Sequence, residues 1–147
     1  MMIRYSALLQ ESRFAGEKTI PGAEPLTMVL FLENPHIPTD RTMNTIYVFA
    51  GEEKSYVGQL IFDVYLDERK LEIVDKQFGG ELAATIPALL WAEQVAKAFG
   101  ISSIHDSLPT GEVEAGSEQM ILYRKLGYEI IPGEPDSTVT RVRKLLR

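Results

Sequence analysis

The sequence predicts an α/β fold built on one mixed sheet. Three observations support this class: a run of strand-like segments joined by short turns, an apolar helix-like segment that ends at a glycine, and a closing strand, helix and hairpin pattern. This order is typical of a sheet with helices packed on its faces. A chain of 147 residues has the usual length of one domain, so we expect residues 1–147 to form a single domain.

The first forty residues give the weakest pattern. Residues 3–9 read as a strand, or as a strand that leads into a turn. Four prolines between positions 21 and 38 divide the following region into short pieces. Within it, the apolar run PLTMVLFLE fits either a short buried helix or a strand, and periodicity alone does not decide between them.

Three strands are predicted next, over residues 44–50, 55–66 and 70–78. Apolar residues of the second strand lie largely on one face: Val57, Leu60, Phe62, Val64 and Leu66. The turns GEEK and DERK are short enough to force neighbouring strands to pair antiparallel. We therefore expect an antiparallel meander.

A helix is predicted over residues 85–99, with Gly100 as its C-terminal cap. Proline is tolerated in the first helical turn, where its missing N–H would have no partner, so Pro87 places the helix start close to Thr85. The next segment, ISSIHDSL, is a short strand. Because it follows a strand and a helix, it can lie parallel to residues 70–78 through a right-handed crossover.

The segment SEQMILYRKLGY (residues 117–128) predicts a second helix, with Ser117 as its N-cap and Gly127 ending it. Tyr128 then begins the strand YEII. The turn PGEPD and the strand STVTRVRKLL follow. The two strands are expected to form a C-terminal hairpin.

Composition excludes several classes. A net charge of −6 argues against a general nucleic-acid binder, whose affinity depends on Lys and Arg. The absence of cysteine excludes disulfides and thiolate metal sites, and the two histidines are too far apart in the sequence to indicate a metal centre. We see no apolar run long enough for a membrane helix and no convincing signal peptide, so a cytoplasmic location is expected.

Three parts of the chain resemble the GNAT (Gcn5-related N-acetyltransferase) superfamily. They are LYRKLGYEII (residues 122–131), the block VDKQFGGELAATIPALLWAEQVAKAFGI (residues 74–101), and the closing hairpin. The resemblance covers Asn44 to Leu146, whereas the first 43 residues match only loosely. It implies a GNAT-like α/β sheet and transfer of an acetyl group from acetyl-CoA to an amine.

The resemblance also implies a loop that holds the pyrophosphate of acetyl-CoA, with the family pattern Arg/Gln-x-x-Gly-x-Gly/Ala. One register uses Gln77, Gly80 and Leu82, and the other uses Gly79, Leu82 and Ala84. Pro87 favours the second register, because it places the helix start near Ala84. By this resemblance the cofactor is expected to contact Ile73, Val74, Gly79, Gly80, Leu82, Ala84 and Thr85, with backbone amides near Ile73 and Val74 polarising the thioester carbonyl.

Tyr123 matches the family tyrosine that protonates the departing thiolate, and a phenol is a sensible donor at neutral pH. The alternative is that its ring packs in the core with the hydroxyl at the rim. Glu72 and His105 are candidate general bases, with Asp63 as a further one. The acidic surface favours a cationic amine as acceptor.

Two other hypotheses stay open. The chain could keep the GNAT fold without catalysis, as a structural or interaction protein such as a phage virion component or an inhibitor of a partner. It could also be an unrelated small α/β binding domain. Alternation of Val139, Arg141 and Arg143 further indicates that the last strand could pair across a homodimer or a larger assembly.

Overall fold

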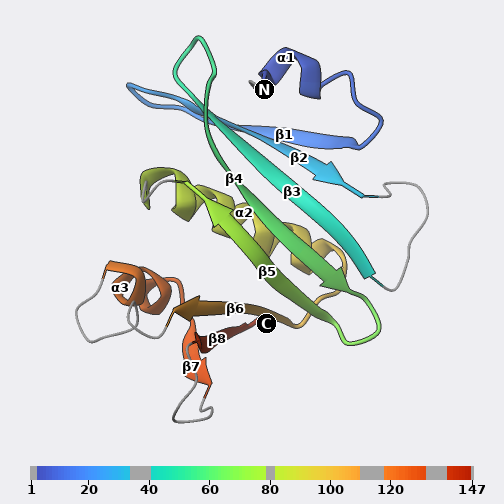
Figure 1. Ribbon diagram of the computed structural model, residues 1–147, viewed down its shortest axis with the longest axis vertical. Coiled ribbons are helices and arrows are strands. Elements are labelled where there is room, and N and C mark those ends of the chain that lie inside the picture. Colours follow the sequence, from blue (N-terminus) through green and yellow to red (C-terminus); the bar gives the residue numbers. More distant parts are fainter. Residues whose placement is uncertain (1–2, 34–40, 79–81, 110–117, 132–138, 147) are drawn as a thin grey trace.

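The computed structural model describes residues 3–33, 41–78, 82–109, 118–131 and 139–146. Eight strands in this part of the chain form one sheet with the order β1-β2-β3-β4-β5-β6-β8-β7 (Figure 1). Every neighbouring pair is antiparallel except β5 and β6. The strands are β1 Phe14–Ile20, β2 Leu26–Leu32, β3 Arg41–Ala50, β4 Ser55–Tyr65, β5 Lys70–Gln77, β6 Ser103–Pro109, β7 Glu129–Ile131 and β8 Val139–Leu145. The helices are α1 Tyr5–Leu8, α2 Leu82–Ala98 and α3 Glu118–Lys125.

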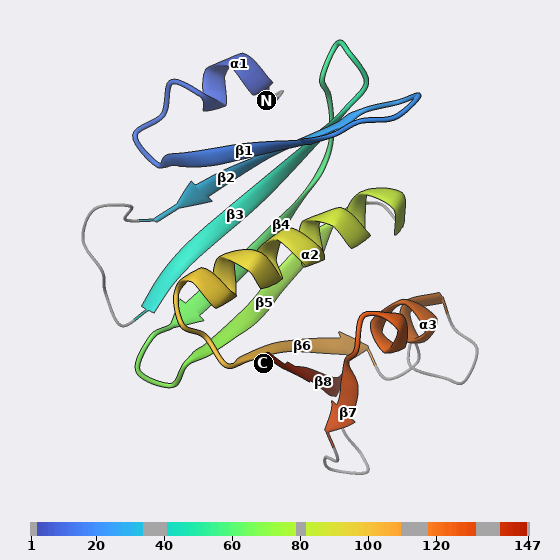
Figure 2. The same ribbon diagram turned by 180° about the vertical axis from the view of Figure 1, so that it is seen from behind.

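The predicted meander, parallel crossover and C-terminal hairpin are confirmed. Helix α2 joins β5 to β6 and crosses the face of the sheet over β3, β4 and β5 (Figure 2). Its buried residues, including Ala88 and Leu89, share one large core with Leu60, Leu71 and Ile104 of the strands. None of the helices in the described ranges is long and apolar enough to cross a membrane.

The N-terminal region differs from the prediction. The expected strand over residues 3–9 is wrong, because residues Tyr5–Leu8 form the short helix α1. The ambiguous run PLTMVLFLE is the strand β2, and β1 pairs with it at the edge of the sheet. Both faces of β2 are buried, with Met28 and Leu30 in the main core and Val29 and Phe31 in a second cluster that α1 covers. A strand covered on both sides loses its apolar alternation, which explains why periodicity could not identify it.

The predicted start of the first helix is also wrong. Helix α2 begins at Leu82, so Pro87 lies inside the helix rather than in its first turn. The first four N–H groups of a helix have no partner within it, and Pro87 lies beyond them. A residue with an N–H at position 87 would donate to the Ala83 carbonyl, and proline removes this bond. The helix tolerates this single loss, and Gly100 ends it with a positive φ of 75° as expected.

Strand β8 lies inside the sheet. It pairs with β6 along its whole length and with β7 over Arg141 to Arg143. Over those residues β8 has no free edge through which a second copy could add a strand. The expected dimer contact through this strand is therefore not supported by the register.

Candidate active site at the divergence of two strands

Strands β5 and β6 lie side by side over only three residue pairs. Their parallel register runs from Lys70 and Ser103 to Glu72 and His105. Beyond this point β5 pairs only with β4, and β6 pairs only with β8. The two strands diverge toward α3, which lies beside the end of β6 in both views (Figures 1 and 2).

A bulge in β5 lies immediately after the last parallel pair. Phe62 of β4 pairs with Ile73, and Ile61 pairs with Asp75, so Val74 is an extra residue in β5. A bulge leaves its extra residue out of the ladder and reverses which face the next side chains take. Ile73 is buried, whereas the side chain of Val74 is 52% exposed. This combination places an irregular stretch of backbone at the mouth of the opening.

On the helix side of the opening, three polar side chains form a buried cluster: Lys76, Asp106 and Tyr123. The Lys76 ammonium lies 2.5 Å from the Asp106 carboxylate and also donates to the Tyr123 hydroxyl, which in turn donates to Asp106. Asp106 also accepts a 2.7 Å bond from the Ser107 N–H. The Tyr123 ring is fully buried, with Lys76 4.7 Å from its centroid.

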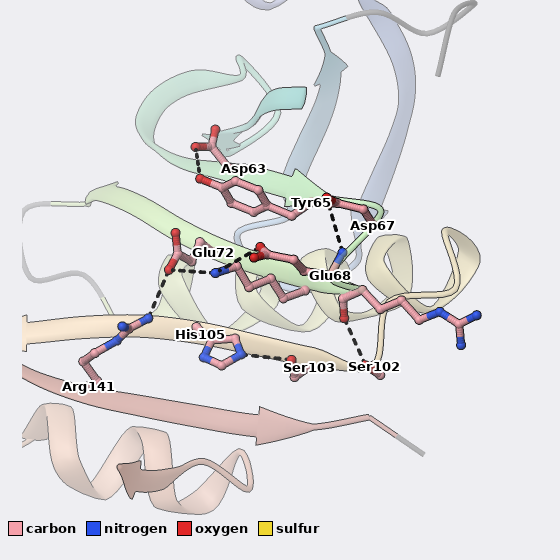
Figure 3. A network of polar contacts seen from close by, with 11 residues as sticks. Asp63, Tyr65, Asp67, Glu68, Glu72, Ser102, Ser103, His105 and Arg141 are labelled. Atoms are coloured by element: carbon pink, nitrogen blue, oxygen red, sulfur yellow. Dashed lines mark hydrogen bonds and ion pairs between the residues drawn. The ribbon is translucent and has the colours of Figure 1, made fainter. Parts of the chain in front are cut away.

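On the opposite side of the sheet, a row of polar side chains crosses the same position. Asp63, Glu72 and His105 are successive cross-strand partners on β4, β5 and β6. Glu72 accepts a 3.1 Å bond from Arg141 of β8 and lies 3.8 Å from Lys70 (Figure 3). Both groups of the Arg141 pair are partly exposed, so screening by water keeps this ion pair weak.

His105 is held in its neutral form. Its Nε2 lies 2.9 Å from the Ser103 hydroxyl, and its buried Nδ1 has no hydrogen-bond partner among the described residues. Burial lowers the pKa of His105 below its usual 6.5, and the nearby charges of Arg141, Lys70 and Arg143 lower it further, against the opposing effect of Glu72. A neutral imidazole can accept a proton near pH 7.

A cavity of about 540 Å³ lies where β5 and β6 diverge. Its lining includes Glu72, His105 and Arg141, the bulge residues Ile73 and Val74, and Asp106. This size is within the range of small-molecule sites. Asp106 is the member of the buried cluster that belongs to this lining, whereas Lys76 and Tyr123 do not line the cavity. Within the described ranges, no three acidic or histidine side chains are grouped as a metal site would require.

Comparison with solved structures identifies the fold. The nourseothricin acetyltransferase crystal structure matches 90% of this chain and 84% of its own with a TM-score of 0.55 and 14% identity. The PaiA N-acetyltransferase of Thermoplasma acidophilum, in complex with coenzyme A, matches 69% of this chain and 61% of its own, with a TM-score of 0.53 and 16% identity. A Bacillus subtilis acetyltransferase in complex with CoA matches 71% of this chain and 78% of its own, with a TM-score of 0.54 and 17% identity. No protein-family model and no curated protein matches the sequence.

The chain has the GNAT fold. This confirms the expected α/β sheet and the resemblance drawn from the sequence. At such low identity the likeness establishes the fold and leaves the chemistry to the residues of the site.

Of the three predicted catalytic residues, Glu72 and His105 come together in the cavity lining, whereas Tyr123 of α3 does not line the cavity. Glu72 and His105 lie on the face away from α2, and Tyr123 lies on the helix side. The ring of Tyr123 packs in the core, with its centroid 4.9 Å from that of Tyr128, and its hydroxyl is bound within the polar cluster and not exposed at the rim. The role of Tyr123 as proton donor stays a prediction.

The predicted cofactor residues fall into three groups. Ile73 and Val74 line the cavity, whereas Ala84 and Thr85 are buried at the start of α2. Leu82 is the first residue of α2, and Gly79 and Gly80 lie outside the described residues. Because α2 begins at Leu82 and not near Ala84, Pro87 no longer supports the second register of the pyrophosphate loop.

Three functional candidates were missed from the sequence: Lys76, Asp106 and Arg141. Lys76 is one of several charged residues near the end of its strand, so its type and position alone do not mark it. The alternation of ISSIHDSL places Asp106 on the same face as Ile104 and Leu108, and a carboxylate between two buried residues is a readable signal for a buried polar partner. No comparable signal marks Arg141, because its partner comes from a distant strand.

Proposed function

We propose that this GNAT-fold protein transfers an acetyl group from acetyl-CoA to an amine. The observation that supports this most is the cavity where β5 and β6 diverge. Its lining combines His105 and Glu72 with the bulge at Val74 and with Asp106, whose carboxylate binds the Tyr123 hydroxyl. Two of the structural neighbours are described as complexes with coenzyme A, which supports a substrate of that type.

In this proposal the residues of the opening divide the reaction between them. The acceptor amine approaches from the side of Glu72 and His105 and attacks the thioester carbonyl carbon, which the Val74 backbone N–H polarises. His105 takes the proton that the amine loses. Tyr123 gives its hydroxyl proton to the sulfur as the C–S bond breaks.

The ion pairs favour His105 over Glu72 as the proton acceptor. Glu72 is already engaged by Arg141 at 3.1 Å and lies 3.8 Å from Lys70, so its carboxylate is occupied by cations. His105 has a lowered pKa, so at neutral pH it is already unprotonated. Because its Nδ1 is buried, the imidazole must turn or its surroundings must shift when the amine binds.

The proposal is tested by following release of the coenzyme A thiol with a chromogenic disulfide while a panel of amines is offered. The chain contains no cysteine, so the reagent does not react with the protein. We expect thiol release that depends on both acetyl-CoA and an amine. Tyr123→Phe should lower kcat at least tenfold while changing the Kd of acetyl-CoA less than about threefold, because the phenol acts only as the bond breaks. Unchanged turnover in this variant would remove Tyr123 from the mechanism.

A second candidate is a GNAT-fold protein that does not catalyse. The favouring observation is that the Tyr123 hydroxyl is already bound by Asp106 and Lys76, with its ring fully buried. Such a cluster can serve stability alone. Absence of thiol release with every amine, together with a Tyr123→Phe variant that is merely less stable, would favour this candidate.

A further inference from the structure

The cavity between β5 and β6 has an acidic part and a basic part. Asp63 and Glu72 lie opposite each other on β4 and β5 and supply the acidic part. Arg141 lies on β8, opposite Ser107 of β6, and supplies the basic part. The strands that carry the two parts, β5 and β8, lie on either side of β6, on which His105 lies, and the side chains of Glu72 and Arg141 meet at 3.1 Å (Figure 3).

Arg141 is suited to bind a further anion. Its side chain is 50% exposed, and its contact with Glu72 uses Nη2. A guanidinium carries five N–H donors in a planar fork, so one contact leaves donors that match the two oxygens of a carboxylate. The pair with Glu72 is partly exposed and therefore weak, so an incoming anion can displace it at little cost.

The charges around His105 give a second sign of positive potential at this end of the cavity. Besides burial, Arg141, Lys70 and Arg143 all lower its pKa, and Glu72 is the one group that raises it. The same potential that disfavours the imidazolium favours an anion of the substrate. An amine without an anionic group would offer Arg141 no new partner and would leave Arg141 paired with Glu72.

We propose that the acceptor is an amine that carries a carboxylate close to its amino group, as an α-amino acid does. Arg141 binds the carboxylate, and Glu72 with Asp63 receives the ammonium beside the bulge at Val74. When the substrate carboxylate draws Arg141 away, Glu72 is released to hold the ammonium. This assignment rests on the proposed acetyl transfer and names the substrate class for the same site.

The test compares each of four α-amino acids with the amine that remains when its carboxylate is removed, for example leucine with 3-methylbutylamine. The readout is kcat/KM from thiol release at fixed acetyl-CoA. We expect at least one amino acid to exceed its matched amine tenfold or more. In Arg141→Met the ratio of the two kcat/KM values should fall to within about threefold. The fall should come from a lower kcat/KM for the amino acid and not from a higher one for the amine.

Arg124→Met is the matched control, because Arg124 lies in the last turn of α3, is exposed and does not line the cavity. It should leave the amino-acid preference unchanged, and thermal unfolding verifies that both variants are folded. If spermidine, an aminoglycoside or the decarboxylated amines react as well as the amino acids, or if Arg141→Met slows both members of a pair equally, the inference is overturned while acetyl transfer stands. If no amine of any class releases thiol, both fall.

Discussion

Lys76 is the residue whose charge matters most to the stability of the site. In Lys76→Met, the Asp106 carboxylate, 5% exposed, loses the cation 2.5 Å away. Removal of one partner of a buried ion pair leaves an uncompensated charge, so we expect the free energy of unfolding to fall by about 3 kcal/mol in urea denaturation.

Lys97→Met provides the control for that change. Lys97 is 52% exposed and pairs with Glu93 one helical turn away at 3.5 Å. Exposed pairs of this kind contribute about 0.3–0.5 kcal/mol, so the control should be nearly neutral. If the two substitutions lower the free energy of unfolding equally, burial does not strengthen the pair of Lys76 with Asp106.

His105 makes a prediction about pH. Because burial and neighbouring cations hold its pKa below 6.5, the neutral, proton-accepting form predominates at pH 7. The rate should therefore be constant near neutrality and fall only as the pH drops through the lowered pKa. His105→Gln should remove this acid limb from the kcat/KM profile. If the limb persists in the variant, His105 is not the group that titrates.

The same pKa shift makes a prediction for stability. Between the lowered pKa and 6.5 the unfolded chain binds a proton at this position that the folded chain does not bind. The contribution of His105 to stability is thus fully present above pH 6.5 and is lost as the pH falls below that value. Urea denaturation at several pH values should show a smaller acid loss in His105→Gln than in the natural chain.

Single residues could be predicted from the sequence only where a local pattern marked them. Tyr123 stood out because a glycine-capped helix end follows it, and Gly127 has the positive φ of 93° that such an end requires. Its partners Lys76 and Asp106 are 47 and 17 residues away. Only the pairing of strands brings such groups together, so no local pattern could connect them.

At the scale of elements, the approach of β4 to the end of β5 depends on Gly58. A Cβ at this position would lie 2.2 Å from the Gln77 carbonyl oxygen and 2.6 Å from the Phe78 ring. Gly58→Ala should therefore separate the strands just before α2 and destabilise the protein by about 1–3 kcal/mol. Gly16→Ala in β1 meets no atom within 4 Å and is the control. Similar unfolding curves for the two variants would contradict the close approach.

Helix α2 offers a test of its own start. If the helix begins at Leu82, Pro87→Ala restores a backbone bond inside it and should raise the free energy of unfolding by about 1–3 kcal/mol. A helix that began at Thr85 would gain almost nothing, because Pro87 would then lie in the first turn. Urea denaturation distinguishes the two results.

The elements that were predicted correctly share a simple cause. The meander has short turns and buried residues that alternate along its strands, and both features can be read locally. The hairpin pairs two strands that follow one another in the sequence. The N-terminal elements failed because β2 is buried on both faces and α1 is only four residues long. Neither gives a periodic signal.

At the scale of the whole molecule, the sheet has a separate apolar cluster on each face. Helix α2 packs on the central strands in the main core, while α1 and a second cluster around Phe49 cover the N-terminal strands on the other face. The single parallel pair, β5 with β6, is the place where the sheet opens. The order of the elements along the chain predicts this topology. The side chains that meet at the opening come from strands far apart in the sequence, so the order of elements does not predict them.

The account depends on acetyl-CoA entering that opening. Its most direct test is calorimetric titration of the full chain with acetyl-CoA. We predict one site per chain with a micromolar Kd. No heat of binding at millimolar acetyl-CoA would contradict the proposed acetyl transfer and leave a GNAT fold without its substrate.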